Sequence, residues 1–196
     1  MKRISDIFFS AIGILVICPF LVLISIIIKL GSKGPVLYKQ VRVGKGNKDF
    51  RIWKFRTMYT GSDKKGLLTV GDRDSRVTKA GLFLRKLKLD ELPQLFNVLF
   101  GEMSLVGPRP EVRKYVDLYS EEDLIVLSVR PGITDYASIH FRNENEILKE
   151  AHDPEQMYIE QIMPEKLALN KKYILERSYS KDIQIILKTL RAVLGN

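Results

Sequence analysis

Residues 7–28 read IFFSAIGILVICPFLVLISIII, a run of 22 residues that holds no charged side chain. As a helix with a rise of about 1.5 Å per residue, this run would reach roughly 33 Å, just enough for a hydrocarbon core of about 30 Å. It is longer than the roughly 7–15 apolar residues of a cleaved signal peptide, and no small-x-small cleavage site precedes Lys29. We therefore expect the segment to stay in the protein and to enter a membrane.

The middle of this run holds Cys18 and Pro19. Proline removes a backbone donor, clashes with the carbonyl four residues earlier and biases the residue before it away from helical angles. The pair therefore predicts a sharp kink or a break. Two arrangements stay open: a kinked spanning helix, and a re-entrant hairpin of two short helices joined by a break.

Basic residues flank the apolar run on both sides. Lys2 and Arg3 precede it, and six more follow: Lys29, Lys33, Lys39, Arg42, Lys45 and Lys48. A spanning helix would place one basic flank outside the cell, against the tendency of cytoplasmic flanks to hold positive charge, whereas a hairpin keeps both flanks beside anionic lipid. This charge pattern favours a re-entrant membrane hairpin over residues 1–32. The length of the remaining chain, residues 33–196, suits one domain.

The chain carries 32 Lys and Arg against 23 Asp and Glu, a net charge of +9. Such an excess indicates an anionic partner, which can be nucleic acid, phospholipid headgroups or a phosphorylated substrate. Nucleic acid is disfavoured because the basic residues are dispersed and aromatic residues are not interleaved with them. The single cysteine excludes an intrachain disulfide and a cysteine-based zinc site, and it is compatible with a domain in the reducing cytosol. The sequence is compatible with an oligomer and does not specify one.

Local patterns predict an α+β fold that is mainly helical with a small β-hairpin. Strands are expected over residues 36–43 and 50–58, joined by the turn GKGNKD, and a polar loop over residues 60–76. Helices are expected over residues 79–89, 90–100, 111–119, 121–129 and 182–194, with irregular structure from the Pro131-Gly132 turn to about residue 145. The last of these helices carries apolar residues on one face and basic residues elsewhere, so it is either an ordinary core-facing helix or an amphipathic helix in the membrane interface.

Residues 89–110, LDELPQLFNVLFGEMSLVGPRP, are the most informative for chemistry. Because Pro93 is comfortable only in the first turn of a helix, it places Asp90 near the N-cap and Glu91 just inside. Free N–H groups and the helix dipole at that end favour anions such as phosphate, and they lower the pKa of a nearby carboxyl. The plain alternative is that Asp90 is only a cap and Glu91 only a first-turn acid.

Four segments in a fixed order carry a resemblance to a known family. They are WKFRTM (residues 53–58), DELPQLFNV (90–98), SLVGPRP (104–110) and RPGIT (130–134). With the apolar segment before them, they resemble the bacterial sugar transferases, the monotopic phosphoglycosyl transferases. The resemblance covers most of the chain, which looks like the minimal form of the family, without the extra N-terminal membrane helices of its larger members.

The resemblance implies a two-step reaction at the cytoplasmic face of the inner membrane. The aspartate, here Asp90, would attack the sugar-bearing phosphate of a UDP-sugar and release UMP. Polyprenyl phosphate, such as undecaprenyl phosphate, would then take the phosphosugar from Asp90, as the first membrane step of glycoconjugate synthesis. The family also implies Mg²⁺, for which Asp90 and Glu91 are the expected ligands, and Glu91 could act instead as a general base or as a positioner of Asp90.

Four cationic residues are expected to bind substrate phosphates. Arg109, fixed between Pro108 and Pro110, suits bidentate phosphate binding. The other candidates are Arg85, Lys54 and Arg56, for which contact with lipid headgroups is the alternative. Relatives in the family often continue Pro-Gly-Ile-Thr with Gly and then Ala-Gln, whereas this chain has DYASIHFR at residues 135–142, so the identity of the sugar stays open.

Two other functions fit parts of the sequence. One is a membrane-tethered basic module that binds an anionic polymer without turnover, and it predicts salt-sensitive binding. The other is a transferase that uses Asp90 and Glu91 as an acid and base pair without a covalent intermediate, and it predicts UDP rather than UMP as the leaving product.

Overall fold

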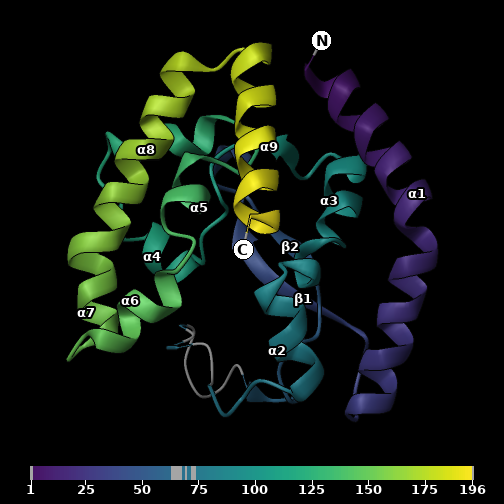
Figure 1. Cartoon of the computed structure of the whole chain (residues 1–196). Helices are drawn as coiled ribbons and strands as arrows, with labels where there is room; N and C mark the ends of the chain where they lie inside the picture. Colours follow the sequence, from purple (N-terminus) through teal and green to yellow (C-terminus); the bar gives the residue numbers. More distant parts are fainter. Residues whose placement is uncertain (1, 63–67, 69, 72–73, 196) are drawn as a thin grey trace.

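The computed structural model describes residues 2–62, 68, 70–71 and 74–195, so the expected loop over residues 60–76 lies partly outside the described residues. One helix, α1 (Lys2–Gly31), begins the chain and continues through Pro19. Its axis changes direction about halfway along (Figure 1). The helical structure is not interrupted, so the expected break at Cys18 and Pro19 is not confirmed. Among the described helices, α1 alone is long and apolar enough to cross a membrane.

Both ends of α1 are attached to the rest of the protein. Near its start, Arg3 donates hydrogen bonds to the carbonyls of Val98 (2.7 Å) and Leu99 (3.1 Å). One turn later, the buried carboxylate of Asp6 accepts a hydrogen bond from the hydroxyl of Ser104 at 2.8 Å. Near its end, α1 buries Ile24 and Ile28 in an apolar cluster that also contains Phe55 and Leu84.

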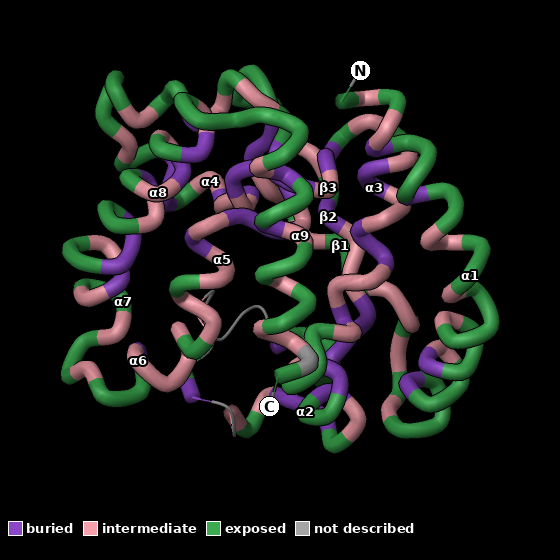
Figure 2. Tube along the Cα trace, turned by 45° about the horizontal axis from the view of Figure 1, so that its top comes forward, coloured by how far each residue is buried: buried purple, intermediate pink, exposed green. Residues whose placement is uncertain are grey.

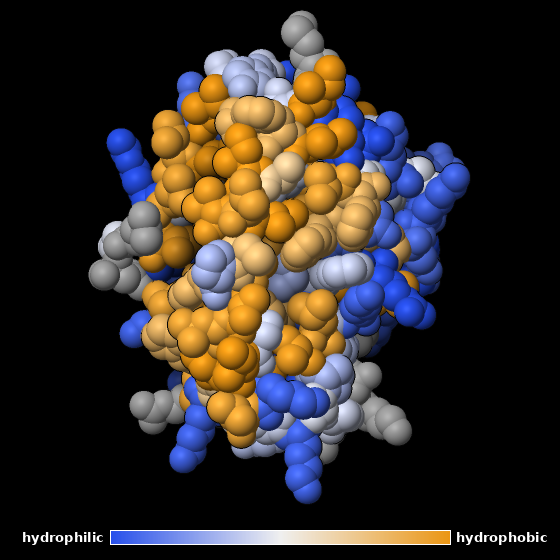
Figure 3. All heavy atoms as spheres, turned by 90° about the vertical axis from the view of Figure 1, so that its right-hand side faces the viewer, coloured by the Kyte–Doolittle hydropathy of each residue, from blue (hydrophilic) through white to orange (hydrophobic). Residues whose placement is uncertain are grey.

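The opposite face of α1 is exposed and apolar. Its exposed large side chains include Phe8, Ile12, Leu15, Val16, Phe20, Leu23 and Ile27. Figure 3 looks onto this side of the molecule and shows a band of hydrophobic residues running from its top to its bottom, with hydrophilic residues along the right-hand edge. Because monomeric water-soluble proteins rarely expose so continuous an apolar surface, this face indicates contact with lipid.

The expected β-hairpin is confirmed. Strands β1 (Leu37–Val43) and β2 (Asp49–Phe55) pair antiparallel, with Leu37 opposite Phe55 and Val43 opposite Asp49. The short turn η1 (Lys45–Asn47) joins them, and its Gly46 has a φ of 68°, which glycine adopts without strain.

The helix expected over residues 79–89 is confirmed, whereas the helix expected over residues 90–100 begins later than expected. Helix α2 (Lys79–Lys86) is capped by the hydroxyl of Thr78 and is followed by Lys88 in the left-handed region. A 3₁₀ turn, η3 (Leu89–Glu91), then precedes α3 (Gln94–Phe100), whose N-cap is Pro93. Gly101 ends α3 with a φ of 93°, as expected. Asp90 therefore lies in the 3₁₀ turn and not at the N-cap of α3, so its expected position was wrong.

A second, parallel pair of strands was not expected. Strand β3 (Ser104–Val106) pairs with β4 (Gly132–Thr134), which brings the GPRP and RPGIT segments side by side. The backbones approach so closely that a Cβ atom on Gly132 would lie 2.1 Å from the nitrogen of Gly107. Only glycine fits this contact.

The remaining chain is helical. It contains α4 (Arg113–Val116), the 3₁₀ helix η4 (Asp123–Ser128), α5 (Tyr136–His140), α6 (Glu144–Glu150), α7 (Pro154–Met157), the π-helix η5 (Tyr158–Ile162), α8 (Met163–Glu176) and α9 (Tyr179–Leu194). In Figure 1, α6, α7 and α8 lie on the side away from α1, with α9 between the two sides. The mainly helical α+β class is confirmed.

Helix α9 has a buried face, as the core-facing alternative predicts, and its placement in the membrane interface stays a prediction. Ile185 is fully buried beside Val106 and Tyr173, so one face packs against the core. A different face exposes Ile183, Leu187 and Leu190. Figure 2 shows α9 as mostly exposed and intermediate, and it shows buried segments concentrated around β2, β3 and α3.

Candidate active site

Glu91 is held by two cations that come from different parts of the chain. Both of its carboxylate oxygens accept hydrogen bonds from the guanidinium of Arg109, one of them at 3.0 Å from Nη1. The ammonium of Lys54, on β2, donates to the same carboxylate at 3.1 Å. Burial alone would raise the pKa of Glu91, but the charges of Arg109 and Lys54 outweigh it and hold the pKa well below its usual range. Glu91 is therefore an ionised, fully paired carboxylate.

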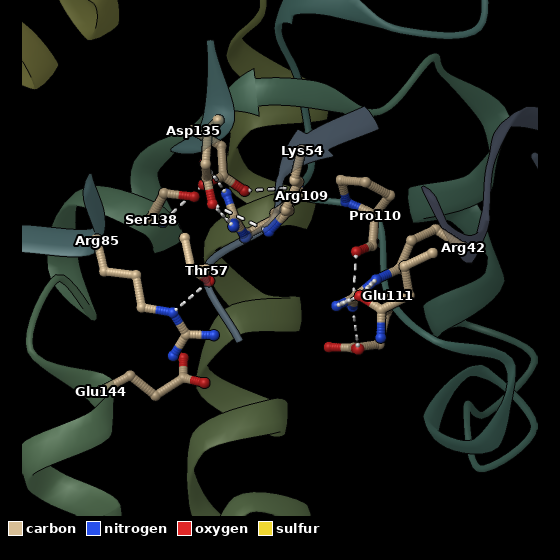
Figure 4. A network of polar contacts seen from close by, with 12 residues as sticks. Arg42, Lys54, Thr57, Arg85, Arg109, Pro110, Glu111, Asp135, Ser138 and Glu144 are labelled. Carbon is tan, nitrogen blue, oxygen red and sulfur yellow. Dashed lines mark hydrogen bonds and ion pairs between the residues drawn. The ribbon is translucent and has the colours of Figure 1, made fainter. Parts of the chain in front are cut away.

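Arg109 is fixed on both of its sides. Its backbone N–H donates to the carboxylate of Asp135 at 2.9 Å, and its guanidinium donates to both carboxylate oxygens of Glu91. Asp135 is fully buried and also caps α5 by accepting a hydrogen bond from the N–H of Ser138 at 2.6 Å. The charge of Glu91 raises the pKa of Arg109. Figure 4 shows Lys54, Arg109 and Asp135 gathered at this point.

Asp90 lies beside this cluster and differs from Glu91 in its surroundings. It is 8% exposed, and its Oδ1 atom has no hydrogen-bond partner among the described residues. Burial raises the pKa of Asp90, and the negative charge of Glu91 raises it further against the opposing charges of Lys54, Arg85 and Lys88. We expected a lowered pKa for a carboxyl at this position. This prediction holds for Glu91 and is wrong for Asp90.

Arg85 approaches the site from α2. Its Nε donates to the hydroxyl of Thr57 at 2.9 Å. Burial lowers the pKa of Arg85, while the charges of Asp90 and Asp74 raise it. The structure therefore brings three of the four expected cationic residues, Arg109, Lys54 and Arg85, close enough to act on the two carboxylates.

Arg56 does not join them. Its side chain is buried, and its guanidinium donates to the carbonyls of Ser32 (2.9 Å), Lys33 (3.0 Å) and Pro35 and to the hydroxyl of Ser32. These groups follow the end of α1 and need donors because a helix end leaves carbonyls without partners. Arg56 was expected to bind phosphate; in this structure its donors instead fix the turn after α1, and the phosphate role stays a prediction.

Two buried residues at the site were not expected from the sequence. Asp135 falls in the segment that departs from the family pattern, where its position after Thr134 gave no sign of a contact with Arg109. Gln94 is fully buried at the start of α3 and lies within the DELPQ motif, which was the only available signal.

A magnesium ion fits this site only in part. Among the described residues, no group of three or more His, Cys, Asp or Glu side chains is placed to hold a metal. Asp90 has a carboxylate oxygen that no described residue hydrogen-bonds, whereas Glu91 would have to give up ion pairs. Mg²⁺ often binds through one carboxylate together with substrate phosphates, and this site suits that arrangement.

A comparison with known protein families covers all of these site residues. The family model described as "Bacterial sugar transferase" matches residues 1–196. The chain belongs to the bacterial sugar transferase family. Its matched region includes every segment of the candidate site, from Lys54 to Asp135.

Curated relatives agree with this membership. Over 99% of the chain, 41% of residues are identical to a UDP-N-acetylgalactosamine-undecaprenyl-phosphate N-acetylgalactosaminephosphotransferase of Aeromonas hydrophila. Over 96% of the chain, 37% are identical to a UDP-glucose:undecaprenyl-phosphate glucose-1-phosphate transferase of Klebsiella pneumoniae. An uncharacterised sugar transferase of Bacillus subtilis is 38% identical over 99% of the chain.

The lengths of these relatives differ. The chain spans 44% of the Aeromonas protein and 39% of the Klebsiella protein, but 87% of the Bacillus protein. It therefore corresponds to less than half of the two relatives whose names state a reaction.

Proposed function

We propose that this family member transfers a phosphosugar from a UDP-sugar to a polyprenyl phosphate, such as undecaprenyl phosphate, and releases UMP. The observation that carries the proposal is that two adjacent carboxylates, Asp90 and Glu91, have different surroundings. Glu91 is saturated by Arg109 and Lys54, while Asp90 keeps an oxygen without a partner among the described residues. The names of the Aeromonas and Klebsiella relatives support the donor and acceptor classes.

In the first step, a carboxylate oxygen of Asp90 attacks the phosphorus that carries the sugar. An O–P bond forms to Asp90, and the bond between that phosphorus and the bridging oxygen breaks, so UMP leaves with the bridging oxygen. In the second step, an oxygen of the polyprenyl phosphate attacks the same phosphorus and displaces the carboxylate. Neither step requires an oxidant or a net proton transfer.

The cations around Asp90 would make the attack of an anion on an anion feasible. Lys54, Arg85 and Lys88 each act on the charge of Asp90, and the side chain of Arg109 is 35% exposed. Such fixed charges stabilise the diphosphate and the leaving UMP without having to reorganise. When bound with the donor, Mg²⁺ would offset further negative charge, and Oδ1 of Asp90 could hold it with one lone pair while the other accepts a hydrogen bond.

Of the roles open to Glu91, we favour that of a positioner. Its paired, low-pKa carboxylate is a poor general base, and a metal would have to compete with Arg109 and Lys54 for it. Glu91 would instead fix Arg109 and Lys54 beside the nucleophile. This argument also weighs against the acid and base pair without a covalent intermediate.

We further propose that residues 1–32 form a re-entrant membrane segment and residues 33–196 a catalytic domain on the cytoplasmic face of the inner membrane. The support is that both ends of α1 contact the same folded body while its outer face is apolar. A helix that crossed the bilayer would have to carry one of those contacts to the other side. The exposed apolar face of α9 would lie in the membrane interface.

The test is incubation with a panel of UDP-sugars, Mg²⁺ and polyprenyl phosphate, scored by UMP release. One donor should yield UMP, and the matched variant Asp90→Asn should yield none while keeping the thermal stability of the wild type. UDP as the product would favour the acid and base alternative. Binding of anionic polymer without turnover of any donor would favour the non-catalytic module.

A further inference from the structure

Helix α3 carries two buried side-chain amides that differ in one respect. Gln94 and Asn97 are both fully buried, one turn apart. Asn97 uses its whole side chain: its Oδ1 accepts from the N–H of Trp53 at 2.9 Å, and its Nδ2 donates to the carbonyl of Arg51 at 2.8 Å and to Glu102 at 2.6 Å. Asn97 is therefore a structural link between α3 and β2.

Gln94 has none of these contacts. Neither its Nε2 nor its Oε1 has a hydrogen-bond partner among the described residues. Among the described residues, five buried side-chain nitrogen or oxygen atoms have no hydrogen-bond partner. Two of them belong to Gln94, and a third is Oδ1 of Asp90. Because a buried polar group without a partner is costly, such a group in a folded protein calls for an explanation, and a functional role is one of the recognised ones.

The spacing along the chain predicts that the side chain of Gln94 lies near the two carboxylates. Hydrogen bonds between residues three apart run from η3 into α3, from Leu92 to Leu89 and from Leu95 to Leu92. Residues three and four apart on such a helical segment are neighbours, and side chains in a helix lean toward its N-terminus. Gln94 follows Asp90 by four positions and Glu91 by three, so we expect its carboxamide to lean toward this pair.

The carboxamide of Gln94 and the unpartnered oxygen of Asp90 are also chemically complementary. An ionised carboxylate only accepts hydrogen bonds, whereas the Nε2 group of glutamine supplies two N–H donors. Both oxygens of Glu91 are already engaged by Arg109, which leaves Oδ1 of Asp90 as the neighbouring acceptor in need of a donor.

We propose that Gln94 is a positioning residue for the nucleophile: its Nε2 donates a hydrogen bond to Oδ1 of Asp90 when the donor substrate is bound, which leaves Oδ2 directed at phosphorus. The inference rests on the proposed function. Hydrogen bonds at active sites are often long or misaligned before substrate binds, so the contact forms as the site tightens. Holding the carboxylate in one orientation accelerates its attack.

The test compares Gln94→Met, which keeps the shape but removes the amide, Gln94→Glu, which keeps the shape but removes the donor, and the control Asn97→Leu. Three quantities are measured: the thermal midpoint without substrates, the burst of UMP from donor and Mg²⁺ without acceptor, and the steady-state kcat and KM. Gln94→Met should keep or raise the thermal midpoint, because it removes two unpartnered polar atoms. Its burst rate and kcat should fall about 10- to 100-fold with KM for the donor within about 3-fold of wild type. Gln94→Glu should lose as much activity, and Asn97→Leu should lower the thermal midpoint.

Three results would overturn the inference. Either Gln94 variant could keep the wild-type burst rate, which would remove the role in orienting Asp90. Gln94→Met could lower the thermal midpoint as much as Asn97→Leu, which would make Gln94 structural. KM could rise with kcat unchanged, which would make Gln94 a substrate contact. A wild-type protein that releases no UMP from any donor would instead contradict the proposed function, so the two failures are distinguishable.

Discussion

At the scale of the residue, adjacent carboxylates in this protein have opposite electrostatic surroundings. Arg109 and Lys54 keep Glu91 ionised, whereas burial and the charge of Glu91 raise the pKa of Asp90. Environments that separate the pKa values of two neighbouring acids are a common means of giving them different roles. The role of Glu91 would then be exerted through its cations, and that of Asp90 through its own oxygens.

Replacing Arg109 by Lys should expose this division. Lysine keeps the charge but cannot grip both oxygens of Glu91, so the cluster would lose its fixed geometry. We expect kcat/KM for the donor to fall about 10- to 100-fold in Arg109→Lys. The matched control is Arg42→Lys, because Arg42 forms a similar pair with Glu111 outside the dyad. Equal losses in the two variants would contradict a specific role for Arg109.

At the scale of the element, the sequence predicted those turns and helix ends that depend only on residues close together in the chain. The turn around Gly46 predicted the hairpin, and Gly101 predicted the end of α3, because each needs a backbone angle that glycine supplies. Candidate roles for Arg109, Lys54 and Asp90 came from the family resemblance, and the structure brings these residues together.

Parts that depend on distant segments were not predicted. Strands β3 and β4 have three residues each and depend on the contact between Gly107 and Gly132, 25 positions apart. The position of Asp90 was missed because Lys88 adopts a left-handed conformation and a 3₁₀ turn intervenes before α3. Arg56 resembled a phosphate ligand in sequence, but only the structure reveals the carbonyls it serves.

Arg56→Met should therefore change stability and not substrate affinity. The substitution removes the four hydrogen bonds that the buried side chain of Arg56 donates to the turn after α1, which should cost about 2–4 kcal/mol in the free energy of unfolding. Denaturant unfolding in detergent measures this loss, with KM for the donor expected within about 2-fold of wild type. Lys33→Met, which removes an exposed charge from the same turn, is the control. A large rise in KM without loss of stability would restore the phosphate role.

The exposed apolar face of α9 makes a separate prediction. Because Cys18 is the only cysteine, Cys18→Ser gives a background for single labels. A polarity-sensitive dye on Leu187→Cys should shift its emission to the blue when vesicles containing anionic lipid are added, since this face would enter the interface. The same dye on Gln184→Cys, an exposed polar position of α9, should shift less. Equal shifts at the two positions would argue against an interfacial α9.

At the scale of the whole molecule, α1 packs against the same helices and strands that carry the residues of the candidate site. Arg3 and Asp6 at the start of α1 bind α3 and β3, and Ile24 and Ile28 near its end pack against β2 and α2. The same elements, β2, α2 and β3, lead to the candidate site. A donor from the cytosol and an acceptor from the bilayer could therefore meet at one place.

The attachment of both ends of α1 predicts the topology. Epitopes at the N-terminus and at the C-terminus should both become accessible only after spheroplasts are permeabilised. Pro19→Ala, which removes the cause of the bend, should expose part of the N-terminal epitope on intact spheroplasts. Access to the wild-type N-terminal epitope on intact spheroplasts would mean that α1 spans the membrane.

The central claim is that the carboxylate of Asp90 becomes bonded to phosphorus, and intact-mass and peptide mass spectrometry test it most directly. Wild-type protein is incubated with its UDP-sugar and Mg²⁺, without acceptor, and quenched; Asp90→Asn is treated identically. The account predicts a mass increase of one phosphosugar on the peptide that contains Asp90, in step with UMP release, and no increase in the variant. Release of UMP by active protein with no adduct on that peptide would contradict it.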